Sequence, residues 1–318
     1  MSQPLKHDQP LHPPPETDAP ASAKAASTQR PGLGMLLGLV GVAVFALSLP
    51  MNRVAAVELD PVFVALARLI VATLLAVLCV GVMRAPVPDR SHWPTLMLAA
   101  LCVAFGFPIL TSLAMAATTA SAGAVIIGLL PLATVVASTV LGQQKPSGVF
   151  WALAIAGAAV VVTFAVLHTE ADTALVDLYL FLAVIVGGFG YAWGGIASRA
   201  LGGWQTICWV VIVAAPVSVP LTAGWLWLMP PPSASPAAWW AVLYLGVGSQ
   251  LFGFFFFYGG MAIGGIARVS QVQLLQLFLT LAFAALFLGE RVDHWFWLTA
   301  VAVVAIVAAA RLAPVESR

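Results

Sequence analysis

Ten long apolar runs follow one another along this chain, and short segments between them hold most of the charged residues. Each run is close to the roughly 20 residues that an α-helix needs to cross about 30 Å of hydrocarbon. The runs lack the alternating polarity of barrel strands, and lipid offers no partner to bare backbone groups, so we expect helices. The predicted spans are 33–51, 61–83, 93–114, 121–141, 148–167, 178–198, 204–229, 237–261, 267–288 and 295–312.

The composition agrees with a chain whose main solvent is lipid. Only 8% of its 318 residues are charged and its mean hydropathy is +1.02, whereas soluble domains carry about 25% charged residues. We therefore expect the lipid bilayer as a partner. The net charge of +1 gives no indication of a nucleic-acid partner.

The ends of the chain differ from its middle. Residues 1–30 hold three consecutive prolines, scattered charge and no apolar run, which predicts a disordered cytoplasmic tail. Residues 31–170 and 171–312 are expected to form two five-helix units, and residues 313–318 a second cytoplasmic tail.

The distribution of cations predicts how the spans are oriented. With the N-terminus in the cytoplasm, ten cations fall on the inside and two, Arg53 and Arg291, on the outside. Such a bias is typical of inner-membrane proteins, in which positive residues stay on the cytoplasmic side. We expect a multi-pass protein of the bacterial inner membrane with both termini in the cytoplasm. The inside cations are Lys6, Lys24, Arg30, Arg84, Arg90, Lys145, Arg199, Arg268, Arg311 and Arg318.

The two halves of the chain resemble each other. A shift of 147 residues places Phe105-Gly106-Phe107 on Phe252-Gly253-Phe254, and Leu141-Gly142 on Leu288-Gly289. Five spans per half is an odd number, so the second half must cross the membrane in the opposite sense. The predicted fold is an all-α membrane protein whose ten transmembrane helices form two inverted five-helix repeats, a construction found in many secondary transporters.

Residues 121–164 contain Ser-Ala-Gly-Ala-Val-Ile-Ile-Gly-Leu-Leu-Pro and Leu-Gly-Gln-Gln-Lys-Pro, and the ninth run ends in Phe-Leu-Gly-Glu-Arg. With Arg68 in the second run, these segments are similar to the EamA-type, ten-helix branch of the drug/metabolite transporter superfamily. The resemblance covers residues 33–312 and implies a transporter with a central cavity. The chain departs from the pattern at Gln143, where the family often has Glu, and at Phe278, the counterpart of Pro131.

Arg68 is the charged residue that lies deepest in any predicted span, roughly 10 Å below the outer edge at 1.5 Å per residue. An arginine at the bilayer centre costs about 2.5–3.5 kcal/mol on insertion scales. It is either a substrate ligand that pairs with a carboxylate or a structural group. In the structural case it bonds helix carbonyls or extends toward Asp60.

The ninth run carries a polar stripe of Gln273, Gln276 and Thr280, which fall within about 60° of one another on a continuous helix. Such a stripe faces a cavity or a neighbouring helix. The central cavity implied by the resemblance favours the first alternative.

Five further residues are candidates for the cavity wall: Asn52, Thr111, Tyr191, Trp193 and Tyr258. The small multidrug exporters, which are distant relatives, carry a membrane glutamate on their first helix, where this chain offers Ser48 and Asn52. Thr111 and Tyr258 are equivalent under the 147-residue shift. For the aromatic residues, ordinary core packing is the competing interpretation. Neutral and aromatic side chains of this kind favour amphipathic or zwitterionic solutes over inorganic ions.

Several function classes are disfavoured. All five histidines lie in the tail or in loops, and no span holds a carboxylate pair, so neither an intramembrane enzyme nor a metal site is expected. No phosphate-binding loop or cofactor motif is present. The prediction is a secondary transporter of a small-molecule substrate, an exporter of metabolites, amino acids or amphipathic drugs, with a non-transporting scaffold or sensor as the alternative. Small-residue faces on the fifth and tenth helices suit tight packing or a homodimer contact.

Overall fold

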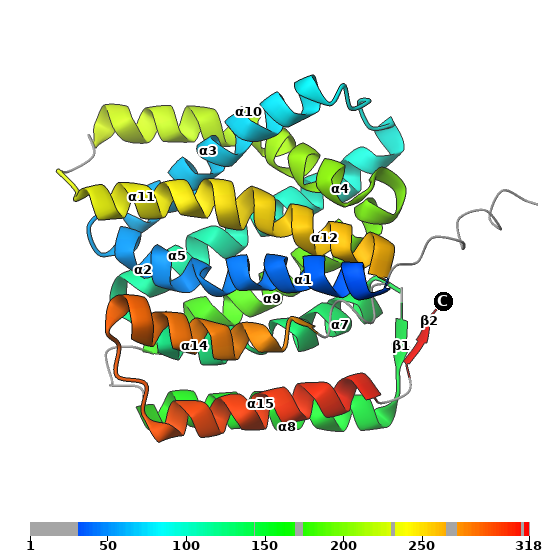
Figure 1. The fold of residues 1–318 in the computed structure, drawn as a ribbon, viewed down its shortest axis with the longest axis vertical. Helices are drawn as coiled ribbons and strands as arrows, with labels where there is room; N and C mark the ends of the chain where they lie inside the picture. The colour runs from blue at the N-terminus through cyan, green and yellow to red at the C-terminus, as the bar shows by residue number, and fades with distance from the viewer. Residues whose placement is uncertain are drawn as a thin grey trace, which may run out of the picture.

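The computed structural model describes residues 31–142, 144–168, 174–229, 233–264, 272–312 and 315–317. The predicted tail 1–30 lies outside these residues. Nearly all of the described chain is helical, and its long helices lie roughly side by side (Figure 1). The helices are α1 (Pro31–Ala46), α2 (Ser48–Ala56), α3 (Pro61–Val82), η2 (Arg90–His92), α4 (Trp93–Ala99), η3 (Ala100–Gly106), α5 (Phe107–Ala117), α6 (Ala120–Ile127), α7 (Leu130–Val140), α8 (Gly148–His168), α9 (Ala174–Leu201), α10 (Gly203–Leu228), α11 (Pro236–Tyr244), η5 (Leu245–Phe252), α12 (Gly253–Gly264), α14 (Leu275–Leu288) and α15 (His294–Leu312).

These helices account for the ten predicted spans. Within the described residues, eight helical stretches are long and apolar enough to cross a membrane, and α14 and α15 are shorter apolar helices. Several spans are longer than predicted: the first continues to Ala56 and the sixth begins at Ala174. The all-α membrane fold expected from the sequence is confirmed.

Several spans are interrupted rather than continuous. The first span breaks at Leu47, between α1 and α2, and the fourth breaks before Pro131, between α6 and α7. The third and eighth spans each contain a π-helical segment, η3 and η5. A shift of 147 residues places η5 on residues 98–105, so the two segments occupy equivalent places in the repeat. The inverted repeat is therefore visible in local backbone structure.

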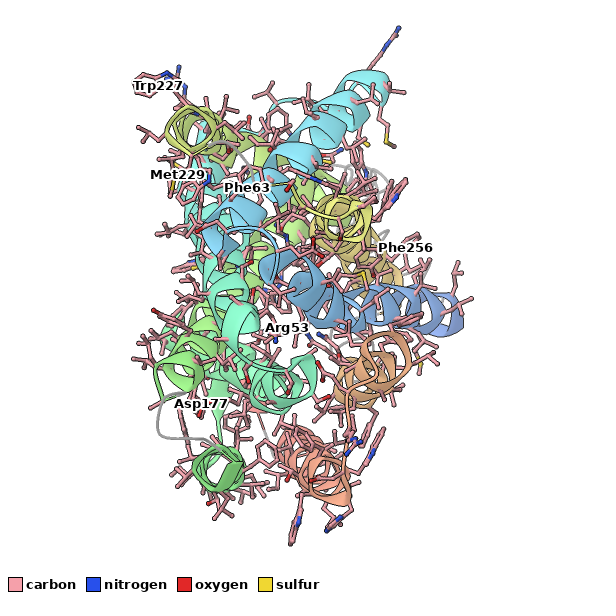
Figure 2. All side chains as sticks on the ribbon, turned by 90° about the vertical axis from the view of Figure 1, so that its left-hand side faces the viewer. Arg53, Phe63, Asp177, Trp227, Met229 and Phe256 are labelled. Atoms are coloured by element: carbon pink, nitrogen blue, oxygen red, sulfur yellow. The ribbon has the colours of Figure 1, made fainter. Side chains whose placement is uncertain are left out.

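The packing of the helices follows the same symmetry. The first span packs along the eighth (α1 on α12), and the sixth packs along the third (α9 on η3 and α5), as an exchange of halves requires. In the same way α7 packs on α9, and α14 packs on α1. The second and seventh spans, α3 and α10, pack on each other, and so do the fifth and tenth, α8 and α15, which lie together at one edge of the bundle (Figures 1 and 2).

Two short strands join distant parts of the chain on one side of the bundle. Strand β1 (Gln144–Pro146) follows the fourth span, and it pairs antiparallel with β2 (Val315–Ser317) near the C-terminus. The sequence predicted only a tail at 313–318, so this pairing is an addition. It places the C-terminal segment on the same side as the loop between the fourth and fifth spans.

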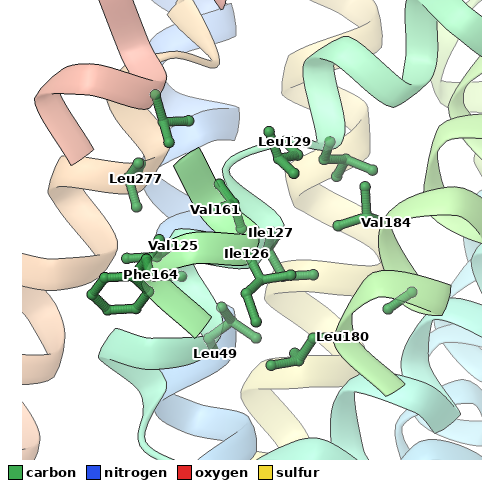
Figure 3. Packing of buried hydrophobic residues seen from close by; sticks show 14 of the residues in the cluster. Leu49, Val125, Ile126, Ile127, Leu129, Val161, Phe164, Leu180, Val184 and Leu277 are labelled. Atoms are coloured by element: carbon green, nitrogen blue, oxygen red, sulfur yellow. The ribbon is translucent and has the colours of Figure 1, made fainter. Parts of the chain in front are cut away.

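The interior of the bundle is apolar and continues across the helices. One cluster brings Leu49, Ile127, Leu180 and Leu277 together from four different spans (Figure 3). Many large apolar residues instead face outward. Figure 2 shows Trp227 and Met229 at the periphery, near the end of α10. Apolar side chains on both the inside and the outside are expected where the surrounding medium is lipid.

Glycines allow α1 and α12 to approach each other closely. A Cβ atom added at Gly41 would lie 2.8 Å from the carbonyl oxygen of Gly253 and 2.8 Å from the amide nitrogen of Phe257. A Cβ atom added at Gly260 of α12 would likewise be too close to the carbonyl oxygen of Gly34. Small residues at such crossings are the usual means of packing helices in membranes. On α8, the small residue Gly157 packs against Ile306 of α15, so part of the predicted small-residue face is used within the chain.

We therefore expect Gly41→Ala to destabilise the fold, because its methyl group would meet backbone atoms that cannot rotate away. The expected loss is about 1–3 kcal/mol, the usual cost of overpacking. Thermal unfolding in detergent measures it. Gly224→Ala on α10 is the control, because nothing lies within 4 Å of a Cβ atom at Gly224. Equal unfolding midpoints for the two variants would show that the close crossing is unimportant.

Candidate functional site

A cavity lies where the two halves meet, with ≈ 570 Å³ of empty space in and around it, part of it open to the surroundings. Its walls come from the first, second, third, fourth, sixth, eighth and ninth spans. Val103 of η3 and Gln250 of η5 both line it, and the Nε2 amide of Gln250 donates to the carbonyl oxygen of Val103 at 3.2 Å. These two residues are 147 positions apart, which is the repeat shift. The cavity therefore lies next to the point where equivalent residues of the two halves touch. The lining residues are Phe45, Ser48, Leu49, Asn52, Arg68, Val103, Phe107, Thr111, Ile127, Gly187, Tyr191, Ser249, Gln250, Phe254 and Gln276.

Arg68 is the charged group in this wall. Its side chain is only 4% exposed, and its Nη2 donates to Ser249 Oγ at 3.1 Å. Ser48 Oγ in turn lies 2.7 Å from Ser249 Oγ, so a chain of hydroxyl groups leads from the guanidinium to the first span. Gly246 allows this contact, because η5 approaches the backbone carbonyl of Arg68 at that residue.

The two structural roles considered for Arg68 do not match its contacts. Asp60 Oδ1 accepts from the amides of Val62 and Phe63, so it caps the helix that carries Arg68. The partner that the structure gives the guanidinium is a hydroxyl group on another helix, and neither Asp60 nor a helix carbonyl takes that place. The Nε atom is buried and has no hydrogen-bond partner.

Asn52 and Thr111 form a buried polar contact between the first and third spans. The Asn52 amide donates to Thr111 Oγ1 at 3.4 Å, and Asn52 Oδ1 accepts from Ser112 Oγ at 3.0 Å. The next residue, Arg53, donates from Nη1 to the carbonyl oxygen of Met115 at 2.7 Å. These bonds tie the C-terminal ends of the two spans together.

The polar stripe of the ninth span lines a second, smaller cavity beside the first. Gln273, Gln276 and Thr280 all reach it, and Gln276 lines both cavities. The assumption of one continuous helix was wrong: α14 begins at Leu275, and Gln273 lies in the turn before it. Thr280 Oγ1 donates to the carbonyl oxygen of Gln276, whereas the buried Nε2 of Gln273 has no partner.

The aromatic candidates divide into two groups. Tyr191 of α9 lines the larger cavity, and its ring centroid lies 5.6 Å from that of Phe254. Trp193 and Tyr258 line neither cavity. Trp193 packs beside Phe189 at 5.4 Å between centroids, and Tyr258 fills the space left by Gly194 and Gly203. The structure thus places these two residues in helix packing.

Three polar wall residues, Ser48, Ser249 and Gln250, were not among the predicted site residues. Each belongs to a span rich in small and apolar residues, where a single serine or glutamine is unremarkable in the sequence. The repeat contains a usable signal, because Ser249 and Gln250 lie in η5, opposite Cys102 and Val103 of η3. Polar residues of one half that replace apolar residues of the other mark places where the symmetry is broken.

Two carboxylates that follow the end of one helix bind the start of another. Glu290, of the Leu-Gly-Glu segment, accepts from the amides of Ala120 and Ser121 at 2.8 and 2.9 Å and from Ser121 Oγ at 2.5 Å. Glu58 accepts from the amide and hydroxyl of Ser235, both at 2.7 Å, and these bonds lower the pKa of Glu58 below its usual value. A carboxylate at a helix N-terminus satisfies amides that have no partner within the helix.

Inverted repeats, interrupted helices and a cavity at their interface define this chain as a polytopic membrane protein, built in the way that many transporters are built. It belongs to the EamA-like transporter family, which it matches over residues 32–166 and 174–311. The family confirms the resemblance seen in the sequence and places the chain among membrane transporters.

Known proteins agree with this assignment. The chain is 38% identical over 281 residues to the uncharacterized transporter YdeK of Bacillus subtilis (strain 168), and the match covers 87% of this chain and 96% of that protein. A solved crystal structure, described only as that of a protein, has 15% identity and a TM-score of 0.63, and the match covers 88% of this chain and 98% of the other. This second likeness concerns the fold alone.

The Glu290 contact predicts a measurable stability effect. Glu290→Gln removes the charge from three hydrogen bonds that join the ninth span to the start of α6, so we expect a loss of about 1–2 kcal/mol. Thermal unfolding in detergent at neutral pH measures it. Asp89→Asn is the control, because Asp89 is exposed and makes no side-chain bond to the helix that follows it. A loss no larger than that of Asp89→Asn would contradict the assigned role.

Proposed function

We propose that this protein is a secondary transporter that exports small metabolites, amino acids or amphipathic drugs by alternating access at the central cavity. The observation that carries the proposal is the position of the cavity, beside the contact between Val103 and Gln250 where the two halves meet. Inverted repeats bind substrate at their interface, where a rocking motion of one half against the other exposes the same site to either side.

The chemistry of the wall suits a small organic solute. Phe45, Phe107, Tyr191 and Phe254 supply apolar and aromatic surface, while amide and hydroxyl groups supply hydrogen bonds. Binding sites for small molecules commonly combine a largely apolar wall with a few polar groups that fix orientation. Transport by this route needs no catalytic residue and no cofactor.

Hydrogen bonds at the outer ends of the spans must break first when one half rocks against the other. Asn52 and Arg53 hold the first span to the third, and Glu290 holds the ninth span to the fourth. Opening toward the outside breaks these bonds, while the close glycine crossings move as rigid units. The interruptions at Leu47 and before Pro131 give the first and fourth spans points at which to bend.

The bacterial inner membrane, with both termini in the cytoplasm, is the location that we propose. The ten-to-two cation asymmetry supports it. The pairing of β1 with β2 is compatible with it, because both strands then lie on the cytoplasmic side. A homodimer through α8 and α15 stays part of the proposal, and both helices keep outward-facing apolar residues such as Ile155 and Val301.

We expect Gln276→Leu to lower transport about three- to tenfold, because Gln276 lines both cavities and the lost amide removes one hydrogen bond to the solute. The measurement uses reconstituted protein, a metabolite mixture, and mass spectrometry of the vesicle contents. Gln205→Leu on α10 is the matched control, since Gln205 lines neither cavity. If the two variants accumulate the same solutes at equal rates and equal amounts of folded protein, Gln276 has no part in transport.

A further inference from the structure

The cavity wall carries an unbalanced charge. Arginine stays protonated in proteins, so Arg68 brings one positive charge to the wall. Among the described residues that line the cavity, none is an aspartate, a glutamate, a lysine or a histidine. The electrostatic character of the cavity is therefore set by a single cation.

The hydrogen bonds of Arg68 are incomplete as well. A guanidinium has five N–H donors, of which one bond goes to Ser249, while the buried Nε–H has no partner. Buried charges are ordinarily paired, because a charge taken out of water without compensation is strongly destabilising. An arginine that lines an internal cavity, lacks a carboxylate partner there and keeps a free donor is arranged to receive an anion.

Neighbouring hydroxyl groups extend this arrangement. Ser249 and Ser48 are bonded to each other and lie beside the guanidinium, and the Tyr244 hydroxyl donates to the carbonyl oxygen of Val44 in the same region. Hydroxyl groups can turn to donate to a new acceptor. A carboxylate next to Arg68 would meet a planar donor fork together with serine hydroxyls, the geometry in which arginine binds carboxylates most strongly.

The rest of the wall distinguishes between classes of anion-bearing solute. A zwitterion brings an ammonium group as well, and the described wall offers it no carboxylate, only neutral oxygens and aromatic faces beside the positive charge of Arg68. The aromatic rings of Phe107, Tyr191 and Phe254 suit an apolar body instead. The charge balance favours a net negative organic acid over a zwitterion or a cation.

We propose that Arg68, with Ser249 and Ser48, forms the carboxylate subsite of the cavity, and that the protein's substrates are small organic monoanions with an apolar or aromatic body. This inference rests on the proposed function for its link to transport. The subsite itself is a binding property that can be measured without transport.

The test compares four probes of similar shape and different charge: phenylacetate, phenylacetamide, phenethylamine and phenylalanine. Thermal unfolding of the purified full-length protein in detergent is followed as each probe is titrated at neutral pH. We expect phenylacetate to stabilise the protein at concentrations at least about tenfold lower than the other three. Equal responses to all four probes, including no response to any, would overturn the subsite.

Variants then connect the discrimination to the arginine. Arg68→Gln should remove at least about tenfold of the affinity for phenylacetate and leave phenylacetamide unchanged, whereas Arg68→Lys should keep part of the preference for the anion. Arg291→Gln is the matched control, because it removes an exposed arginine outside the cavity. Unaltered discrimination in Arg68→Gln would overturn the assignment. If Arg68→Gln does not fold, Arg68→Lys takes its place. A preference of Arg68→Lys for phenylacetate over phenylacetamide equal to that of the wild-type protein would then overturn the assignment.

Transport of the same probes into vesicles separates the two proposals. Charge-selective binding that depends on Arg68, without movement of phenylacetate across the membrane, supports the subsite and contradicts the transporter. Movement of phenylacetate and phenylacetamide at equal rates supports the transporter and contradicts the subsite.

Discussion

Close backbone contact between helices is the constraint on which this structure depends, because lipid gives apolar helix faces little reason to associate. The contact is closest where the two halves meet. Gly41 admits the backbone of α12, and Gly246 admits the backbone of α3 beside Arg68. The second contact brings the guanidinium within 3.1 Å of Ser249, so the glycine that packs the repeats also positions the charged group of the cavity.

Within this symmetric frame, function depends on asymmetry. Two inverted halves allow the same cavity to face either side of a membrane, but a symmetric wall would leave its ends chemically alike. Residues 215 and 216, which the repeat shift places opposite Arg68 and its neighbour Leu69, are Ala215 and Pro216. The charge is therefore carried by one half alone, and the aromatic and amide groups around it provide the remaining contacts.

The fold followed from the sequence because lipid imposes strong rules on length, backbone bonding and charge. Arg68, Gln276, Thr111 and Tyr191 were placed within predicted spans by those rules and Asn52 just beyond the first one, and all five line the larger cavity. The hydrogen-bond partners of these residues could not be predicted from the sequence. Ser249 lies 181 positions from Arg68, and no local pattern connects the two.

Two predicted positions differ from the structure for specific physical reasons. Tyr258 was predicted as a site residue of the eighth span, yet it lines neither cavity, because Gly194 makes room for its ring and Gly203 for its backbone within the packing. Equivalence in sequence does not preserve environment when the surrounding side chains differ. Gln273 was placed on a helix that begins two residues later, at Leu275, because an apolar run shows its length more reliably than the residue at which its helix starts.

The claim that the interface cavity alternates between the two sides of the membrane is tested most directly by thiol accessibility. Ile127 lines both cavities, so Ile127→Cys, in a protein whose native cysteines are replaced, presents a thiol to the pathway. Ile155→Cys on α8 is the matched control, because Ile155 faces outward from the bundle. A membrane-impermeant thiol reagent is applied to oriented vesicles from each side in separate reactions. The account predicts that Ile127→Cys reacts from both sides while Ile155→Cys does not react; reaction from one side only, or from neither, would contradict it.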